Sequence, residues 1–242
     1  MHADTLKSWR KSERERLVAA RLNLDETALK AMRLSIDSHL DRAFPGFASG
    51  LLAFCWPFRN EYDPRFLAHR LRERGARTAL PVVVAPRQPL IFRLWAPGDA
   101  LAKGVYDIPY PAAGEAVVPD AALVPMNGFD AGGYRLGYGG GFFDRTLASL
   151  RAADARRPGA DSRPTIAIGV SYEMARIETI HPQPYDIPMD YVVTERGVYE
   201  RIDGRLALLD APSVANPGYS SPACLAHEIA PGYFGENKDQ PG

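Results

Sequence analysis

Residues 50–84 read GLLAFCWPFRNEYDPRFLAHRLRERGARTALPVVV, and this stretch indicates the fold. Its opening GLLAFCW is almost entirely apolar, which is typical of a buried strand. Asp63 and Pro64 then form a preferred helix start, a capping residue followed by proline, and Arg74 and Gly75 mark the helix end. TALPVVV predicts a second strand. A strand, a helix and a strand in this order indicate a βαβ unit with parallel strands.

The same alternation continues along the chain. Further strands are predicted for LIFRLW, AALVPMNG, TIAIGVSY and YVVTE, and EMARIETI at residues 173–180 has a helix-like pattern. The expected fold class is therefore α/β: a single Rossmann-like three-layer domain with a largely parallel sheet, N-terminal helices and a C-terminal hairpin. We expect this domain to span residues 1–210.

The two ends of the chain have their own patterns. Two helices are predicted within the first forty-odd residues, the second capped by Asp25. Apolar residues on this second helix recur at helical spacing and should face the core; they are Leu29, Met32, Ile36 and Leu40. GVYERI and RLALLD around Asp203 and Gly204 predict a hairpin. Pro, Gly, Ser and polar residues dominate residues 211–242, which predicts a flexible tail.

A glycine-rich segment, FDAGGYRLGYGGGFFD at residues 129–144, is the strongest indication of function. Closely spaced glycines lack Cβ atoms, so consecutive backbone N–H groups can turn toward one anion; they are Gly137, Gly139, Gly140 and Gly141. The following RTLASLRAA predicts a helix, whose positive end would face the same anion. Asp144 stands where a magnesium ion bridging phosphate oxygens would need an oxygen ligand. The segment predicts a phosphate site, against the simpler interpretation of a structural turn.

Two common nucleotide-binding loops are excluded by the residues after these glycines. A P-loop needs Lys-Ser/Thr after its last glycine, whereas Phe142 and Phe143 follow Gly141. A dinucleotide fingerprint needs a third glycine where Phe142 stands, and an acidic residue closing a later strand. A generic Rossmann-type dehydrogenase is therefore disfavoured.

Composition limits the partners. The chain has 242 residues, and Lys plus Arg and Asp plus Glu both number 29, so its formal net charge is zero. This balance argues against nucleic acid and anionic membranes as partners, and anion binding must be local. The charged start MHADTLKSWRKSERER and the lack of a long apolar run argue against secretion and membrane insertion. We expect a cytoplasmic monomer.

Isolated residues give weaker indications. Neither Cys55 nor Cys224 has metal-ligand spacing, and Cys55 is expected in the core. Among the histidines, His181 in a Pro-rich loop is the one expected to line a site. In the same loop, Asp186 and Asp190 are not a helical pair, and Asp190, next to a strand, suits a cap or turn role.

The first predicted helix is crowded with charge. Lys7, Arg10 and Arg14 share one face at helical spacing, which allows a local anion contact. The interleaved Glu13 and Glu15 instead favour a solvated, salt-bridged surface. From the residues alone, the solvated surface is favoured for most of these charges, and the local anion contact stays open for Lys7, Arg10 and Arg14.

In the order and spacing of several motifs, the chain resembles the 5-formyltetrahydrofolate cyclo-ligase family, also called methenyltetrahydrofolate synthetases, over about residues 5–200. The most specific motif, RLGYGGGFFD, is similar to the family's Arg-Leu-Gly-x-Gly-x-Gly-Tyr-Tyr-Asp signature. Supporting elements follow in the family's order: the basic N-terminal helix with Lys7 and Arg10, FCWPFRNEYD, LIFRLW, YDIP at residue 106 and YDIPMDYVVTE at residue 185.

The resemblance implies a ligase of one-carbon metabolism that uses ATP and Mg²⁺. Such an enzyme cyclises 5-formyltetrahydrofolate to 5,10-methenyltetrahydrofolate and releases ADP and phosphate. The family phosphorylates the formyl oxygen, and the second folate nitrogen then attacks the activated carbon and expels phosphate. This chemistry needs charge neutralisation and alignment more than a strong base.

The resemblance also implies site residues. The ATP site would contain the four glycines of the signature, with Arg135 and Phe143 nearby. Lys7 and Arg10 would close over the phosphates. Arg135 and Lys7 would act in catalysis. Asp144 and Asp186 match the family's magnesium positions. For the folate, Glu61 would meet the pterin N–H groups, with apolar or stacking surface from Trp56, Tyr106 and Phe142. Trp56 and Tyr106 could equally be core residues.

Two departures from the family pattern define an alternative hypothesis. Phe142 and Phe143 stand where the family usually has Tyr-Tyr, which keeps the rings and removes two hydroxyls. The residues after position 200 also extend beyond the usual family end. The alternative is a diverged, non-catalytic member of the family that binds folate or nucleotide.

Overall fold

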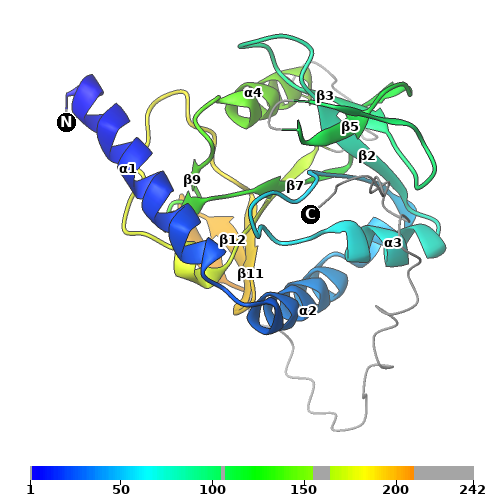
Figure 1. The fold of residues 1–242 in the computed structure, drawn as a ribbon, viewed down its shortest axis with the longest axis horizontal. Coiled ribbons are helices and arrows are strands. Elements are labelled where there is room, and N and C mark those ends of the chain that lie inside the picture. The colour runs from blue at the N-terminus through cyan, green and yellow to red at the C-terminus, as the bar shows by residue number, and fades with distance from the viewer. Residues whose placement is uncertain (1, 105–106, 155–163, 210–242) are drawn as a thin grey trace, which may run out of the picture.

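The computed structural model in Figure 1 describes residues 2–104, 107–154 and 164–209. Within these residues, one nine-stranded sheet runs through the centre of the molecule. Its five central strands are parallel: β11 (Tyr191–Thr194), β10 (Ile166–Val170), β7 (Ala121–Pro125), β1 (Leu51–Phe54) and β2 (Arg77–Val82), in this spatial order.

Antiparallel strands flank this parallel centre. Beyond β11 come β12 (Gly197–Ile202) and β13 (Arg205–Leu208), and beyond β2 come β3 (Ile91–Leu94) and β6 (Ala116–Val117). A largely parallel sheet was predicted, and its centre confirms this. The antiparallel pairing of β3 with β2 was not predicted.

Helices cover both faces of the sheet, which gives the predicted three layers. α2 (Glu26–Ala43) and α3 (Arg65–Glu73) lie on one face and α4 (Phe142–Asp154) on the other (Figure 1). Successive side chains of a strand point to opposite faces. Leu52 and Phe54 of β1 accordingly join the core under α2 and α3. Ala53 joins the core that contains Leu147 of α4.

The remaining helix lies at one edge of the layers. α1 (Ala3–Leu22) runs past a two-stranded sheet made of β8 (Gly128–Phe129) and β9 (Arg135–Leu136) (Figure 1). Leu17 of α1 packs with Leu136 and Ile180 in a small separate core. No helix in the described ranges is long and apolar enough to cross a membrane.

Local predictions are confirmed where the chain controls its own geometry. Asp25 caps α2, since its carboxylate accepts a bond from the N–H of Ala28 at 2.7 Å. Gly75 follows α3 at φ 104°. Asp203 and Gly204 join β12 to β13 at φ 49° and 82°, and positive φ at both positions fits a type I′ hairpin turn.

The helix predicted for residues 173–180 is wrong: only a 3-10 turn forms, η3 (Glu173–Ala175). The neighbouring segment occupies the backbone groups that a helix would need. The N–H of Ile177 donates to the carbonyl of Phe129 at 2.9 Å, and the N–H of Ile180 donates to the carboxylate of Asp130 at 3.0 Å.

Three short elements were also not predicted: η1 (Pro45–Ser49) and the two-stranded sheet of β4 (Leu101–Lys103) and β5 (Pro109–Pro111). The predicted flexible tail at residues 211–242, which includes Cys224, lies outside the described residues. Tyr106 lies outside them as well.

Candidate active site

A cavity of about 1350 Å³ opens at the carboxyl ends of the parallel strands. Cys55 and Trp56 extend from β1 into its wall, Pro81 comes from β2, and Pro125 ends β7. The glycine loop, defined as residues 137–141 between β9 and α4, forms another part of the wall. Ligands of open α/β sheets bind at this edge. Because typical small-molecule pockets reach about 1,000 Å³, the cavity has room for two ligands.

The glycine loop presents backbone donors to this cavity. Gly139 and Gly141 adopt φ 93° and 62°, a conformation that side chains disfavour. α4 begins at Phe142, directly after the loop. Among the described residues, no backbone carbonyl accepts a bond from the N–H groups of Gly139, Gly140 or Gly141. These donors lie at the positive end of a helix dipole, an arrangement suited to an anion.

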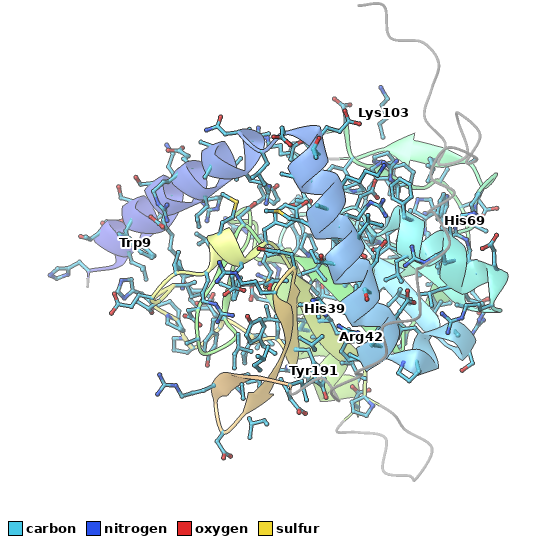
Figure 2. The ribbon with its side chains drawn as sticks, turned by 90° about the horizontal axis from the view of Figure 1, so that it is seen from below. Trp9, His39, Arg42, His69, Lys103 and Tyr191 are labelled. Atoms are coloured by element: carbon cyan, nitrogen blue, oxygen red, sulfur yellow. The ribbon has the colours of Figure 1, made fainter. Side chains whose placement is uncertain are left out.

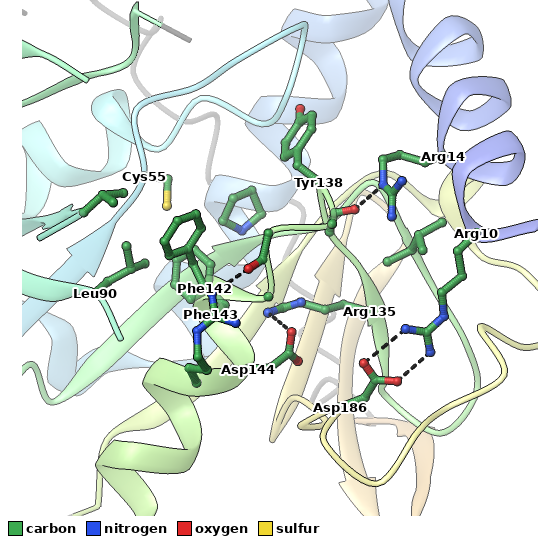
Figure 3. A pocket seen from close by; sticks show the side chains of 18 of the residues that line it. Arg10, Arg14, Cys55, Leu90, Arg135, Tyr138, Phe142, Phe143, Asp144 and Asp186 are labelled. Atoms are coloured by element: carbon green, nitrogen blue, oxygen red, sulfur yellow. Dashed lines mark hydrogen bonds and ion pairs between the residues drawn. The ribbon is translucent and has the colours of Figure 1, made fainter. Parts of the chain in front are cut away.

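Arg10 ties α1 to the loop of residues 180–186. Its guanidinium donates to both carboxylate oxygens of Asp186, at 2.5 and 3.3 Å, and to the carbonyls of Ile180 and His181 (Figure 3). The side chains of Arg10 and Asp186 are only 16% and 8% exposed. A bidentate, charge-assisted pair of this kind fixes both partners.

Arg14 and Lys7 complete the charged face of α1. Arg14 donates to the carbonyl of Gly137 at 2.5 Å, so it holds the glycine loop directly. Lys7 is exposed at the cavity wall. Of the two interpretations of this helix, the local anion contact is therefore the better supported for these three residues, which all line the cavity.

Arg135 and Asp144 form a second ion pair at the base of the loop (Figure 3). The two groups are 3.1 Å apart, with side chains 5% and 14% exposed. The other Asp144 oxygen accepts a bond from the N–H of Ile187 at 3.2 Å. The Nε of Arg135 finds no hydrogen-bond partner among the residues that the structure describes. The guanidinium lies 5.6 Å from the centre of the Phe143 ring.

The residues predicted to bind magnesium are thus close together. The bond from Ile187 brings Asp144 next to the residue that follows Asp186. The described residues contain no cluster of three or more His, Cys, Asp or Glu side chains suited to a metal. Mg²⁺ commonly binds one or two carboxylates and completes its shell with substrate phosphates and water. Two carboxylates near the backbone donors of the glycine loop fit this pattern.

Glu61, in the segment that follows β1, also lines the cavity. Its side chain is 6% exposed, and its Oε2 accepts a bond from the N–H of Phe58 at 3.1 Å. Its Oε1 accepts a bond from the hydroxyl of Tyr138 at 2.9 Å and lies 3.8 Å from Arg21 of α1. Burial raises the pKa of Glu61, which Arg21, Tyr138 and the Phe58 N–H act to lower.

The aromatic residues predicted for the folate have mixed roles. Trp56 lines the cavity and also packs edge-on against Trp95 at 5.7 Å, so it is both a wall and a core residue. Phe142 and Phe143 line the cavity as well.

Two expectations for single residues are wrong. His181 does not line the cavity, because its ring packs against Trp9 at 4.8 Å and only its carbonyl serves the site. Cys55 was expected in the core, but it is half-buried and lines the cavity. Burial raises the pKa of its thiol, which keeps it protonated. Figure 2 shows His39 on α2 and His69 on α3, and neither lines the cavity.

Sequence reasoning missed several cavity residues, including two with polar contacts at the glycine loop. Tyr138 occupies a variable position of the signature, so nothing marked it. Arg145, in the first turn of α4, donates to the carbonyl of Gly140 at 2.5 Å and lies 5.3 Å from the Phe142 ring. Its position directly after Asp144 is a signal that could have indicated it.

The chain is similar to known proteins in sequence and in fold. The 5-formyltetrahydrofolate cyclo-ligase of Escherichia coli K12 is 30% identical over 149 residues, which cover 59% of this chain and 76% of that protein. The enzyme of the same name from Mycolicibacterium smegmatis is 33% identical over 154 residues, covering 59% and 72%.

A solved structure, the 5,10-methenyltetrahydrofolate synthetase of Aquifex aeolicus, superimposes with a TM-score of 0.65 at 26% identity, covering 86% of this chain and 99% of that one. The sequence profile of the 5-formyltetrahydrofolate cyclo-ligase family matches residues 6–195, close to the extent of the predicted resemblance. The chain therefore belongs to the 5-formyltetrahydrofolate cyclo-ligase family, a family of ligases.

Proposed function

We propose that this protein uses ATP and Mg²⁺ to cyclise 5-formyltetrahydrofolate to 5,10-methenyltetrahydrofolate, releasing ADP and phosphate. The observation that carries the proposal is that the glycine loop at the start of α4 and a buried carboxylate open on one cavity. The glycine loop lies on one wall and Glu61 on another. A cavity of about 1350 Å³ can hold a nucleotide beside a folate.

In this proposal the glycine loop and α4 hold the ATP phosphates. The N–H groups of Gly139 to Gly141 supply hydrogen bonds, and the helix dipole supplies positive potential. Lys7 and Arg135 neutralise charge on the phosphoryl group as it moves to the formyl oxygen. When bound, Mg²⁺ would neutralise further phosphate charge, held by Asp144 and Asp186.

The folate would lie against the opposite wall. Glu61 accepts hydrogen bonds from the pterin N–H groups, and Trp56 supplies an apolar surface. The formyl oxygen attacks the γ-phosphorus, and the bond from this phosphorus to the bridging oxygen of ADP breaks. The second folate nitrogen then attacks the formyl carbon and loses its proton to water, and phosphate leaves with the former formyl oxygen. The enzyme contributes alignment, charge neutralisation and exclusion of water.

The test is turnover by the purified full-length chain. With 5-formyltetrahydrofolate, ATP and Mg²⁺, we expect methenyl-folate absorbance to appear with one ADP per product. Omission of ATP is the control. If both ligands bind and no product forms, the non-catalytic alternative is favoured, and Phe143→Tyr then tests whether a missing hydroxyl is the cause. Failure to bind 5-formyltetrahydrofolate would refute the proposed function and also the folate-binding form of the alternative.

A further inference from the structure

Tyr138 connects the two walls of the cavity. It lies between Gly137 and Gly139 in the glycine loop, yet its side chain reaches the segment that follows β1. Its ring packs against Phe58 with centroids 5.8 Å apart and planes tilted by 59°. Its hydroxyl donates to Glu61 at 2.9 Å. A residue of the proposed phosphate cradle thus holds the carboxylate of the proposed folate wall.

The hydroxyl is central to the contacts of Glu61. It also accepts a bond from Arg21 of α1 at 3.1 Å, whereas the guanidinium of Arg21 is 3.8 Å from the carboxylate itself. Arg21 therefore acts on Oε1 of Glu61 in two ways, directly as an ion pair and through the hydroxyl of Tyr138. Because a carboxylate offers about four acceptor sites, the bonds from Tyr138 and Phe58 fix its orientation and leave capacity for a ligand.

We infer that Tyr138 is a positioning residue for the folate: it orients the Glu61 carboxylate that receives the pterin. This inference rests on the proposed function. A rigidly held acceptor loses little freedom on binding and is already aimed at its donor.

The protonation of Glu61 gives a readout that a merely structural residue would not move. Burial raises the pKa of Glu61, and Arg21, the Tyr138 hydroxyl and the Phe58 N–H oppose this rise. The other titratable groups beside it are the thiol of Cys55 and the hydroxyl of Tyr172, which follows β10. Removal of the Tyr138 hydroxyl removes a group that favours the carboxylate, so the pKa of Glu61 should rise further. As the solution is acidified, the variant without this hydroxyl should therefore lose folate binding at a higher pH than wild type does.

The experiment measures ligand affinity by calorimetry in Tyr138→Phe, which keeps the ring on Phe58. Tyr191→Phe is the matched control, because its hydroxyl also donates to a glutamate, Glu200 at 3.0 Å, outside the cavity. A hydrogen bond to a charged group contributes enough for roughly tenfold or more in affinity. We expect about tenfold weaker binding of 5-formyltetrahydrofolate, a nucleotide affinity within about twofold of wild type, and an upward shift in the pH of half-maximal folate binding.

The outcomes separate the inference from the function on which it rests. If wild type binds folate and Tyr138→Phe binds it equally well, the inference is overturned and the proposed function stands. Equal weakening of folate and nucleotide would also overturn it, because Tyr138 would then only anchor the loop. A wild type that does not bind 5-formyltetrahydrofolate would overturn both. In the Glu61→Gln background, Tyr138→Phe should have no further effect on folate affinity, and an additive loss would contradict action through Glu61.

Discussion

The ion pair between Arg135 and Asp144 allows a prediction with two separable readouts. Asp144→Asn keeps the shape of the side chain and removes its charge. In the ligand-free protein, Arg135 would then be a buried cation without its 3.1 Å partner. In the enzyme, the proposed magnesium site would lose one of its two carboxylates. The first effect is measured as stability, and the second as the dependence of turnover on free Mg²⁺.

The expected loss of stability follows from burial. Removal of one partner from a buried pair costs about 3–5 kcal/mol, and the low end applies here because the cavity admits water. For a domain of this size each kcal/mol lowers the melting temperature by about 2–4 °C, so Asp144→Asn should melt about 6–12 °C below wild type.

Asp190→Asn is a matched control, since Asp190 also accepts bonds from one arginine, Arg151, and one backbone N–H, that of Ala167. The side chains of Arg151 and Asp190 are each 41% exposed. A pair this exposed contributes at most about 1 kcal/mol, so the control should lose no more than about 4 °C.

Two assays decide the outcome. Thermal unfolding without ligands measures the ion pair, and turnover at increasing free Mg²⁺ with saturating substrates measures the metal site. We expect turnover of Asp144→Asn to fall by about a hundredfold or more, with Asp190→Asn near wild type. Equal melting temperatures for the two variants would refute the stabilising role of the pair. Undiminished Mg²⁺-dependent turnover in Asp144→Asn would refute the metal assignment.

Three further predictions concern single substitutions. Gly139→Ala strains a backbone at φ 93° by about 1–3 kcal/mol and should weaken nucleotide binding about tenfold. Gly46→Ala is the control, because nothing lies within 4 Å of the added Cβ, and it should leave nucleotide binding unchanged. Equal nucleotide affinities of the two variants would argue against phosphate binding by the glycine loop. Phe143→Tyr restores a hydroxyl usual in the family and should raise turnover or leave it unchanged, so a loss of turnover measured by methenyl-folate absorbance would contradict this role. Burial acts to raise the pKa of Glu173, but hydrogen bonds, chiefly from Arg176, lower it below its ordinary value. Its stabilising contribution is therefore present above the ordinary pKa of 4.5 and lost as pH falls through the lowered value. The unfolding free energies of wild type and Glu173→Gln should differ by about 1 kcal/mol at pH 7 and converge in acid, and a constant gap would contradict this assignment.

Local sequence patterns were sufficient where the chain determines its own geometry. The cap at Asp25, the β1–α3–β2 unit and the turn at Asp203 and Gly204 each depend on residues a few positions apart. The glycine loop belongs to the same group, because its positive φ angles require glycine whatever surrounds it.

Contacts between distant segments were beyond the reach of those patterns. Residues 173–180 have a helical pattern, yet their backbone bonds to Phe129 and Asp130, almost fifty residues earlier, prevent a helix. The bond from Tyr138 to Glu61 spans 77 positions, and that from Arg10 to Asp186 spans 176. Family resemblance indicated which residues gather at the site. It did not indicate that each magnesium-binding candidate would be paired with an arginine.

The pairing follows from the charge of the cavity. The chain as a whole is neutral, but the described residues of the cavity wall include six basic and four acidic side chains. Without a ligand the basic groups would repel one another, and the pairs of Arg10 with Asp186 and Arg135 with Asp144 offset this repulsion. These carboxylates are therefore expected to stabilise the ligand-free protein whether or not they bind a metal. Loss of activity alone cannot identify a magnesium ligand here, because loss of the ion pair would displace the arginines as well. Asp144 would be identified as a metal ligand only by a change in the dependence of turnover on free Mg²⁺. That change must exceed what the lower stability of the variant explains.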